Sequence, residues 1–136
     1  MNRFYLSYKN KTFLYESKKV KLIKSSKISE LKKAKIAINT FHTMKNKYLS
    51  KFINNFNGFF RITGADSFNF CLIAEGKLDI LIEDKLKLID IMPVISIIEN
   101  AGAVISDWNG KKNFKSGKVL VASNKLLFKK IFKKIK

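Results

Sequence analysis

Asp90 is the carboxylate whose place in the sequence points most directly to chemistry. It follows a lysine-flanked loop and precedes an apolar run, a pattern that predicts a helix from Asp90 to Asn100. A carboxylate at a helix start can act as an N-cap, because it accepts hydrogen bonds from free backbone N–H groups and complements the helix dipole. Where the helix start opens onto a cleft, the same carboxylate can instead bind Mg²⁺, which prefers oxygen ligands. The spacing alone leaves both interpretations open.

The turn Gly64-Ala65-Asp66 is another candidate site. It precedes a helix predicted from Asp66 to Glu75, so backbone N–H groups are exposed at the helix N-terminus. Such an end can hold a phosphate or another polar group of a substrate. Many helix starts bind nothing, so this pattern gains weight only together with other motifs.

The remaining reactive side chains favour structural roles. His42 is the single histidine, and no cysteine or second histidine stands near it, which argues against a metal site. Cys71 lies within the apolar run 70–73, as expected of a small buried hydrophobic residue. A single cysteine also excludes an internal disulfide and fits a reducing cytoplasm.

The elements that would position these residues alternate between strand and helix. Short strands are predicted within residues 3–30 and strands at 35–40, 59–62, 78–82, 104–105 and 119–122, with helices at 44–56, 66–75, 90–100 and 124–135. This alternation predicts a layered α/β domain with a mixed sheet and flanking helices. The last helix carries an apolar stripe that favours packing on a sheet over lying on a membrane surface.

Lysine dominates the charge of the 136-residue chain. Lysine and arginine total 28 against 10 acidic residues, which gives a net charge of +18, and Arg3 and Arg61 are the only arginines. This charge raises an alternative function, a small lysine-rich binding module for nucleic acid or anionic surfaces without catalysis. However, the lysines are scattered from Lys9 to Lys136, and nucleic-acid recognition favours the planar fork of arginine. The pattern therefore argues against nucleic acid as a partner.

The sequence also argues against a membrane partner. No run reaches the roughly 18 uninterrupted apolar residues that a membrane-spanning helix needs. The longest candidate, 86–98, contains Lys87, Asp90 and Pro93. The first residues lack the apolar core of a secretion signal, so we expect a cytoplasmic protein.

Three spaced segments together resemble the C-terminal signature of the inositol monophosphatase family. They are Arg61–Gly76 (RITGADSFNFCLIAEG), Leu88–Gly102 (LIDIMPVISIIENAG) and Ser106–Gly110 (SDWNG). Within them, Gly-Ala-Asp-Ser-Phe and the Lys-Leu-Ile-Asp sequence that ends at Asp90 most closely resemble the histidinol-phosphatase branch. The resemblance implies a Mg²⁺-dependent phosphate monoester hydrolase. Its small phosphorylated substrate would be histidinol phosphate, in histidine biosynthesis, or an inositol phosphate.

The resemblance also implies roles for individual residues. Asp90 matches the helix-opening aspartate that ligates a catalytic magnesium. Glu83, seven residues earlier, stands where relatives use a carboxylate to hold a substrate hydroxyl or amine. Gly64-Ala65-Asp66 matches a substrate-facing turn, and Asp107-Trp108 matches a structural pair at a strand end.

Two metal-binding motifs of the family are missing from the sequence. They are a Glu-Glu motif and Asp-Pro-x-Asp-Gly-Thr, and before Asp66 the only acidic residues are Glu16 and Glu30. A two-metal phosphatase needs clustered carboxylates to hold ions about 4 Å apart. We therefore expect the catalytic residues on a missing N-terminal segment and no activity from this chain alone. Its protein partner would be a second copy, as a homodimer, or a complementary N-terminal half.

The resemblance predicts the architecture as well. We expect the C-terminal half of the inositol monophosphatase fold together with a short N-terminal β remnant. Residues 1–33 would form the remnant of an N-terminal antiparallel sheet, with exposed strand edges. Residues 34–136 would form the C-terminal α/β domain.

Overall fold

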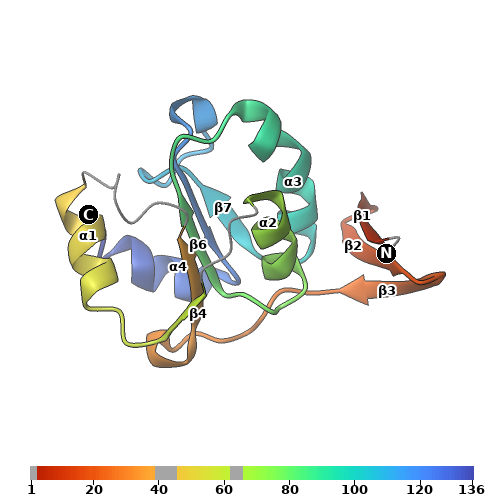
Figure 1. Ribbon diagram of the computed structural model, residues 1–136, viewed down its shortest axis with the longest axis horizontal. Helices are drawn as coiled ribbons and strands as arrows, with labels where there is room; N and C mark the ends of the chain where they lie inside the picture. Colours follow the sequence, from red (N-terminus) through yellow and green to blue (C-terminus); the bar gives the residue numbers. More distant parts are fainter. Residues whose placement is uncertain (1–2, 39–45, 62–65) are drawn as a thin grey trace.

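The computed structural model describes residues 3–38, 46–61 and 66–136 (Figure 1). Within these residues the chain forms two sheets and four α-helices, which confirms the layered α/β prediction. The strands are β1 (Arg3–Tyr8), β2 (Lys11–Glu16), β3 (Lys19–Ile23), β4 (Lys35–Ile38), β5 (Phe59–Arg61), β6 (Ile80–Glu83), β7 (Val104–Ser106) and β8 (Val119–Ala122). The helices are α1 (Lys47–Asn54), α2 (Asp66–Ala74), α3 (Leu88–Asn100) and α4 (Lys125–Phe132), with short 3-10 turns η1 (Leu31–Lys33) and η2 (Phe114–Ser116).

The N-terminal sheet, β1-β2-β3, is an antiparallel meander. Its two tight turns place consecutive residues in the left-handed region, at Lys9 and Asn10 (φ 46° and 57°) and at Ser17 and Lys18 (φ 50° and 63°). Two successive positive φ values match the right-handed twist of the strands that such a turn joins. The short strands predicted within residues 3–30 are therefore confirmed.

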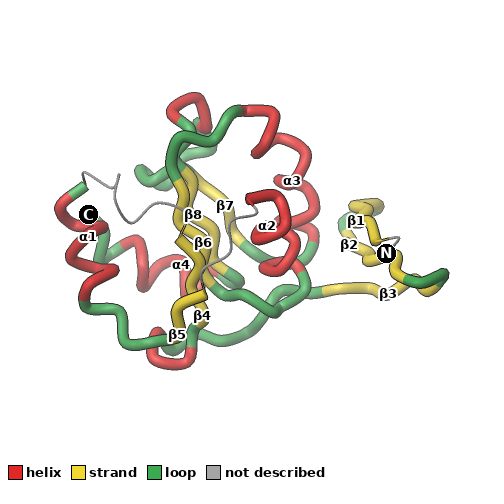
Figure 2. The backbone as a smooth tube through the Cα atoms, in the orientation of Figure 1, coloured by secondary structure: helices red, strands yellow, loops and turns green. Residues whose placement is uncertain are grey.

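The central sheet has the order β5-β4-β6-β8-β7 and lies between two helical layers (Figure 2). Strand β4 is parallel to β5 and β6, whereas β8 is antiparallel to β6 and β7. Every residue of β6 and β8 is buried, as expected of strands covered on both faces. Helices α1 and α4 pack on one face through Leu49, Phe52 and Leu127, and α2 and α3 pack on the other.

The N-terminal sheet packs on the outer side of α2 and α3 and adds a fourth layer (Figure 1). Leu14 and Ile23 are buried against Ala74 and Ala101. Thr12 Oγ1 donates a hydrogen bond of 2.8 Å to the carbonyl of Ile97. The layers therefore run helix, sheet, helix, sheet, and the predicted division at residues 33 and 34 stays a prediction.

Helix α3 begins two residues earlier than predicted, so the interpretation of Asp90 as its N-cap is wrong. The helix starts at Leu88 and its N-cap residue is Lys87. Strand β6 is also shifted, from the predicted 78–82 to Ile80–Glu83. The predicted strand and helix around His42 continue into residues 39–45, which lie outside the described residues. In the described ranges, no helix combines the length and the apolar character that crossing a membrane requires.

Candidate active site

The carboxyl ends of three parallel strands lie at one edge of the central sheet. Strands β4, β5 and β6 run in the same direction, with α2 following β5 and α3 following β6. Because each helix follows the carboxyl end of one of these parallel strands, the N-termini of α2 and α3 lie toward this edge. In open α/β sheets, ligands bind outside the carboxyl ends of the strands. The fold therefore brings the predicted residues Glu83, Asp90 and Asp66 to the edge where a site is expected.

Glu83 is the last residue of β6 and is fully buried (0% exposed). It pairs with Val119 in the register between β6 and β8, so its backbone is fixed by the sheet. Removing a carboxylate from water is costly. The burial of Glu83 at the end of a strand therefore indicates that its carboxylate binds or positions another group, and that it does not simply keep the surface hydrated.

Asp90 stands in the first turn of α3 and is partly buried. Its Oδ2 accepts a hydrogen bond of 2.9 Å from the backbone N–H of Lys87, while the Asp90 N–H donates to the Lys87 carbonyl at 3.0 Å. Asp90 therefore stabilises the helix start from inside the first turn. A carboxylate has about four lone-pair sites, so this hydrogen bond and cation binding are compatible.

The turn at residues 64–66 is described only in part. Asp66 begins α2, as predicted. Gly64 and Ala65 lie outside the described residues. The substrate-facing role of Gly64-Ala65-Asp66 therefore stays a prediction.

The residues that the structure describes do not form a magnesium site by themselves. Within 3–38, 46–61 and 66–136, no three histidine, cysteine, aspartate or glutamate side chains gather closely enough to hold a metal ion. A two-metal hydrolase needs clustered carboxylates. Asp90 alone does not fit that requirement.

A glycine that the sequence analysis did not single out fixes the loop between Glu83 and Asp90. The Leu86 N–H donates a hydrogen bond of 3.1 Å to the carbonyl of Gly117. Gly117 has φ +69°, and a Cβ atom there would lie 2.4 Å from the Leu86 carbonyl oxygen. The position of the loop therefore depends on a residue without a side chain at 117. The one sign of this role in the sequence is a single glycine shortly before the apolar residues of β8.

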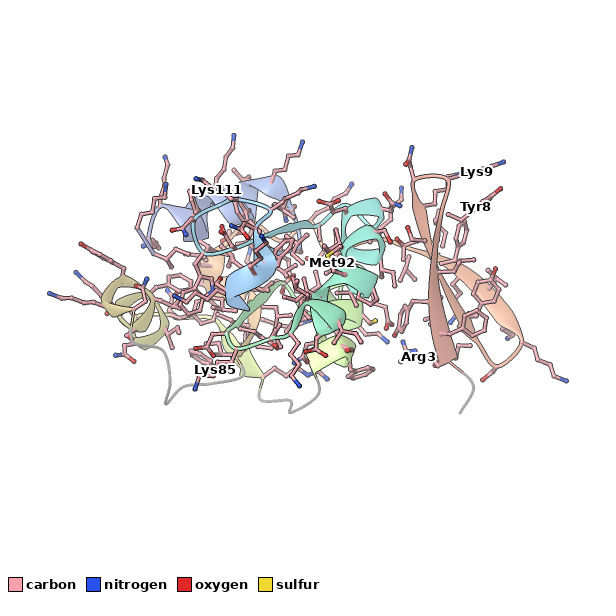
Figure 3. All side chains as sticks on the ribbon, turned by 90° about the horizontal axis from the view of Figure 1, so that it is seen from above. Arg3, Tyr8, Lys9, Lys85, Met92 and Lys111 are labelled. Carbon is pink, nitrogen blue, oxygen red and sulfur yellow. The ribbon has the colours of Figure 1, made fainter. Side chains whose placement is uncertain are left out.

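The same loop carries positive charge toward the helix start. Lys85, in the left-handed region at φ 60°, and Lys87, at the N-cap, flank it. Figure 3 shows Lys85 projecting at the margin of the molecule. Lysines beside a helix N-terminus favour an anionic group such as a phosphate.

Asp107-Trp108 forms a structural turn after β7, as the resemblance implied. Asp107 Oδ1 accepts hydrogen bonds from the N–H groups of Asn109 (2.9 Å) and Lys111 (2.7 Å). The Trp108 ring is buried, and its Nε1–H donates to the carbonyl of Val119 at 3.2 Å. This turn stabilises the end of the central sheet.

Cys71 is buried in α2, as predicted. Burial, and to a smaller extent the charge of Glu75, raises the pKa of the Cys71 thiol to about 11. At neutral pH the thiol is therefore protonated and is not a nucleophile.

The distribution of basic side chains does not favour the alternative of a nucleic-acid binding module. Such a module gathers lysines on one face. Figure 3 shows nitrogen-tipped side chains projecting on several sides of the molecule. The net charge of +18 is therefore spread over the surface.

Comparison with known proteins identifies the class to which this fold and site belong. The sequence matches the profile of the inositol monophosphatase family over residues 1–136. The chain belongs to the inositol monophosphatase family, whose members act as phosphatases.

Among curated proteins, the chain is similar to a bifunctional phosphatase, IMPL2, chloroplastic, of Arabidopsis thaliana. The two are 41% identical over 49 residues, which cover 36% of this chain and 14% of the relative. The histidinol-phosphatase branch is not distinguished by this match.

Solved structures share the fold at low sequence identity. The extragenic suppressor protein suhB from Bartonella henselae matches with a TM-score of 0.73 at 21% identity, over 93% of this chain and 52% of its own. The inositol monophosphatase from Anabaena (Nostoc) matches with a TM-score of 0.74 at 15% identity, over 92% and 54%. The Thermotoga maritima IMPase gives 0.70 at 19%, over 92% and 51%. The chain thus spans about half the length of these structures.

Proposed function

We propose that this chain is the substrate-binding half of a phosphate monoester hydrolase. The observation that carries the proposal is the placement of Glu83 and Asp90, with the starts of α2 and α3, at one edge of the central sheet in a family of phosphatases. Histidinol phosphate is our first choice of substrate, because the Gly-Ala-Asp-Ser-Phe segment resembles that branch. An inositol phosphate is the alternative substrate.

In this proposal the described residues bind and orient the substrate. Glu83 holds a hydroxyl or amine group of the substrate, and Lys85 and Lys87 attract its phosphate with the start of α3. Asp90 adds one carboxylate to the site. Mg²⁺, the cofactor that family membership suggests, needs more carboxylates than the described residues offer, so its binding belongs to the assembled enzyme. The single buried Cys71 is consistent with our proposal of a cytoplasmic location.

The chain alone should therefore release no phosphate above background from either substrate in the presence of Mg²⁺. Activity should appear when a family segment that carries the Glu-Glu and Asp-Pro-x-Asp-Gly-Thr motifs is added. Phosphate release can be measured for both substrates under the same conditions. Robust release by the chain alone would overturn the proposal that it is half of an enzyme.

Asp90→Asn separates the catalytic role of Asp90 from its structural one. Asparagine can still accept the hydrogen bond from the Lys87 N–H, so stability should change by less than about 1 kcal/mol. Phosphate release by the assembled enzyme should fall at least about 100-fold, because the carboxylate charge is lost. Glu99→Gln, at the other end of α3, is the matched control and should leave activity unchanged. Equal activity of Asp90→Asn and wild type would remove Asp90 from the site.

A further inference from the structure

A pocket lies on the α1 side of the central sheet. Its volume is about 820 Å³, and it is lined by residues of η1, of α1 and of the chain after α4. Figure 1 shows the C-terminus beside α1, on the side of the sheet opposite to α2 and α3. The described residues that line the pocket do not include Glu83, Lys85, Lys87 or Asp90. The pocket is therefore separate from the candidate active site, and we call it the α1 pocket.

One face of α1 forms a wall of the α1 pocket. Four lining residues lie at helical spacing, namely Tyr48, Lys51, Phe52 and Asn55. Residues three or four positions apart in a helix are neighbours on its surface, so these side chains share one face. Phe52 is buried in the core, whereas Tyr48 is 55% exposed. The wall therefore offers a free aromatic ring beside a lysine and an amide.

A glycine allows the chain after α1 to lie against η1. A Cβ atom on Gly58 would lie 2.5 Å from the carbonyl oxygens of Leu31 and Ala34. The next residue, Phe59, donates a backbone hydrogen bond of 2.9 Å to the Ala34 carbonyl. Residues of η1 and of the loop after α1 therefore line the same pocket, and a side chain at position 58 would force them apart.

The lining of the α1 pocket is basic. Its charged residues are four lysines and one glutamate, namely Lys32, Lys51, Lys134, Lys136 and Glu30. The Glu30 carboxylate is already paired with Lys33 at 2.6 Å and with Lys32 at 3.6 Å. The excess of positive charge favours an anionic ligand, and lysine ammonium groups bind phosphate as point charges.

The aromatic and amide side chains indicate the rest of the ligand. An exposed ring such as that of Tyr48 can stack on a nucleobase, and this stacking is possible with every base. The amides of Asn55 and Asn57 line the pocket, and an amide has both donors and an acceptor for the edge of a base. The volume lies within the range of roughly 300–1,000 Å³ that is usual for small-molecule sites. Inorganic phosphate would leave the aromatic ring unused.

We propose that the α1 pocket binds a nucleoside monophosphate. The phosphate lies among the lysines of η1, of α1 and of residues 134–136, and the base stacks on Tyr48. The bound nucleotide connects three segments that are far apart in the chain, so it stabilises the fold as well. This site does not depend on the proposed phosphatase reaction, because its residues are separate from those of the candidate active site.

The test titrates the purified full chain with AMP, GMP, CMP and UMP in isothermal titration calorimetry. EDTA is present, so that hydrolysis that depends on divalent cations does not contribute to the heat. We expect at least one nucleotide to bind with a Kd below about 1 mM. The corresponding nucleoside and inorganic phosphate should each bind at least about tenfold more weakly, because each lacks one of the two recognised groups.

Variants of α1 locate the bound nucleotide. Tyr48→Ala removes the stacking ring and should weaken binding at least about tenfold. Lys51→Gln removes one lysine charge from the pocket and should weaken binding at least about fivefold. Lys47→Gln, one turn earlier on the same helix and outside the pocket lining, is the matched control and should leave the affinity unchanged. All three side chains are exposed, so the variants should fold, and circular dichroism would verify this.

The other outcomes would overturn the proposal. Lys87→Gln, at the start of α3, should leave the affinity unchanged. If it abolished binding while Lys51→Gln did not, the nucleotide would be assigned to the candidate active site. Equal weakening by Lys47→Gln and Lys51→Gln would indicate a general attraction to the positively charged surface. If none of the four nucleotides bound at about 1 mM, the α1 pocket would not be a nucleotide site.

Discussion

Replacing Glu75 with glutamine should loosen the N-terminal sheet from the helices. Glu75 follows α2, and its side chain is only 4% exposed. It pairs with Arg3 of β1, accepts a hydrogen bond of 2.6 Å from the Tyr5 hydroxyl and pairs with Lys77 at 2.7 Å. Glutamine keeps the size of the side chain but removes the charge that these donors share.

The expected loss of unfolding free energy at pH 7 is about 3 kcal/mol. Removing one partner of a buried ion pair costs about 3–5 kcal/mol, because the other charge stays buried. We take the lower end of this range because Arg3 retains its ion pair with Glu16 at 3.6 Å and because the Lys77 side chain is 54% exposed to water. With a urea slope of about 2 kcal/mol/M, the midpoint should fall by about 1–2 M.

The effect should disappear in acid. Burial by itself would raise the pKa of Glu75, but the hydrogen bonds from Lys77 and Tyr5 and the charge of Arg3 outweigh it, so the pKa is lowered. A carboxylate with a lowered pKa in the folded state stabilises the fold above its unfolded pKa of about 4.3. That stability is lost as pH falls through the folded pKa. The difference between wild type and Glu75→Gln should therefore shrink below about pH 4.

Urea unfolding can be followed by the fluorescence of Trp108, the single tryptophan. Glu99→Gln, which removes a partly exposed ion pair with Lys112, is the control and should cost less than about 1 kcal/mol. The reasoning is refuted if Glu75→Gln stays within 1 kcal/mol (roughly the value of an exposed pair) of wild type at pH 7. A difference that does not change with acidification would also contradict it, because the ionised Glu75 carboxylate would then not be the cause.

Two further predictions concern residues away from this ion pair. At pH 8, Cys71 should not react with a disulfide reagent in the folded chain, because it is buried and its thiol pKa is raised to about 11; rapid labelling without urea would contradict this. Gly117→Ala should lower stability by at least about 2 kcal/mol, because its φ of +69° and the Leu86 carbonyl leave no room for a methyl group. The neighbouring variant Ser116→Ala should cost much less, and equal urea midpoints for the two would refute the steric explanation.

The sequence predicted most elements but misplaced the start of α3. Strand β8 was predicted with its observed bounds, because its four residues form a short apolar run between polar residues. The helix start was missed because Lys87 is an unusual N-cap and Asp90, inside the first turn, supplies the hydrogen bond instead. A rule that expects the capping side chain at the N-cap therefore places the helix too late.

Sequence patterns did not predict contacts between residues that are far apart in the chain. The apolar run 78–82 places Asp79 in a strand, yet its buried carboxylate lies before β6 and accepts a hydrogen bond from the N–H of Lys35, 44 residues away. The loop before Asp90 depends on Gly117 in the same way. The roles expected of Glu83 and Asp90 came from the family resemblance. That both residues lie at the same edge of the central sheet follows from the directions of the strands, which only the structure gives.

The segment that joins the two sheets imposes an order on folding during synthesis. Ser25, just after β3, donates from its backbone N–H and its hydroxyl to the carbonyl of Ala101, and the hydroxyl also reaches the carbonyl of Ser123. At a translation rate of about 5–20 residues per second, roughly 5–20 s separate the synthesis of Ser25 from that of Ser123. In the first part of that interval, until α2 and α3 have been made, the meander has no helix to pack on and exposes apolar side chains on both faces. A newly made chain is therefore most prone to aggregation before α3 leaves the ribosome.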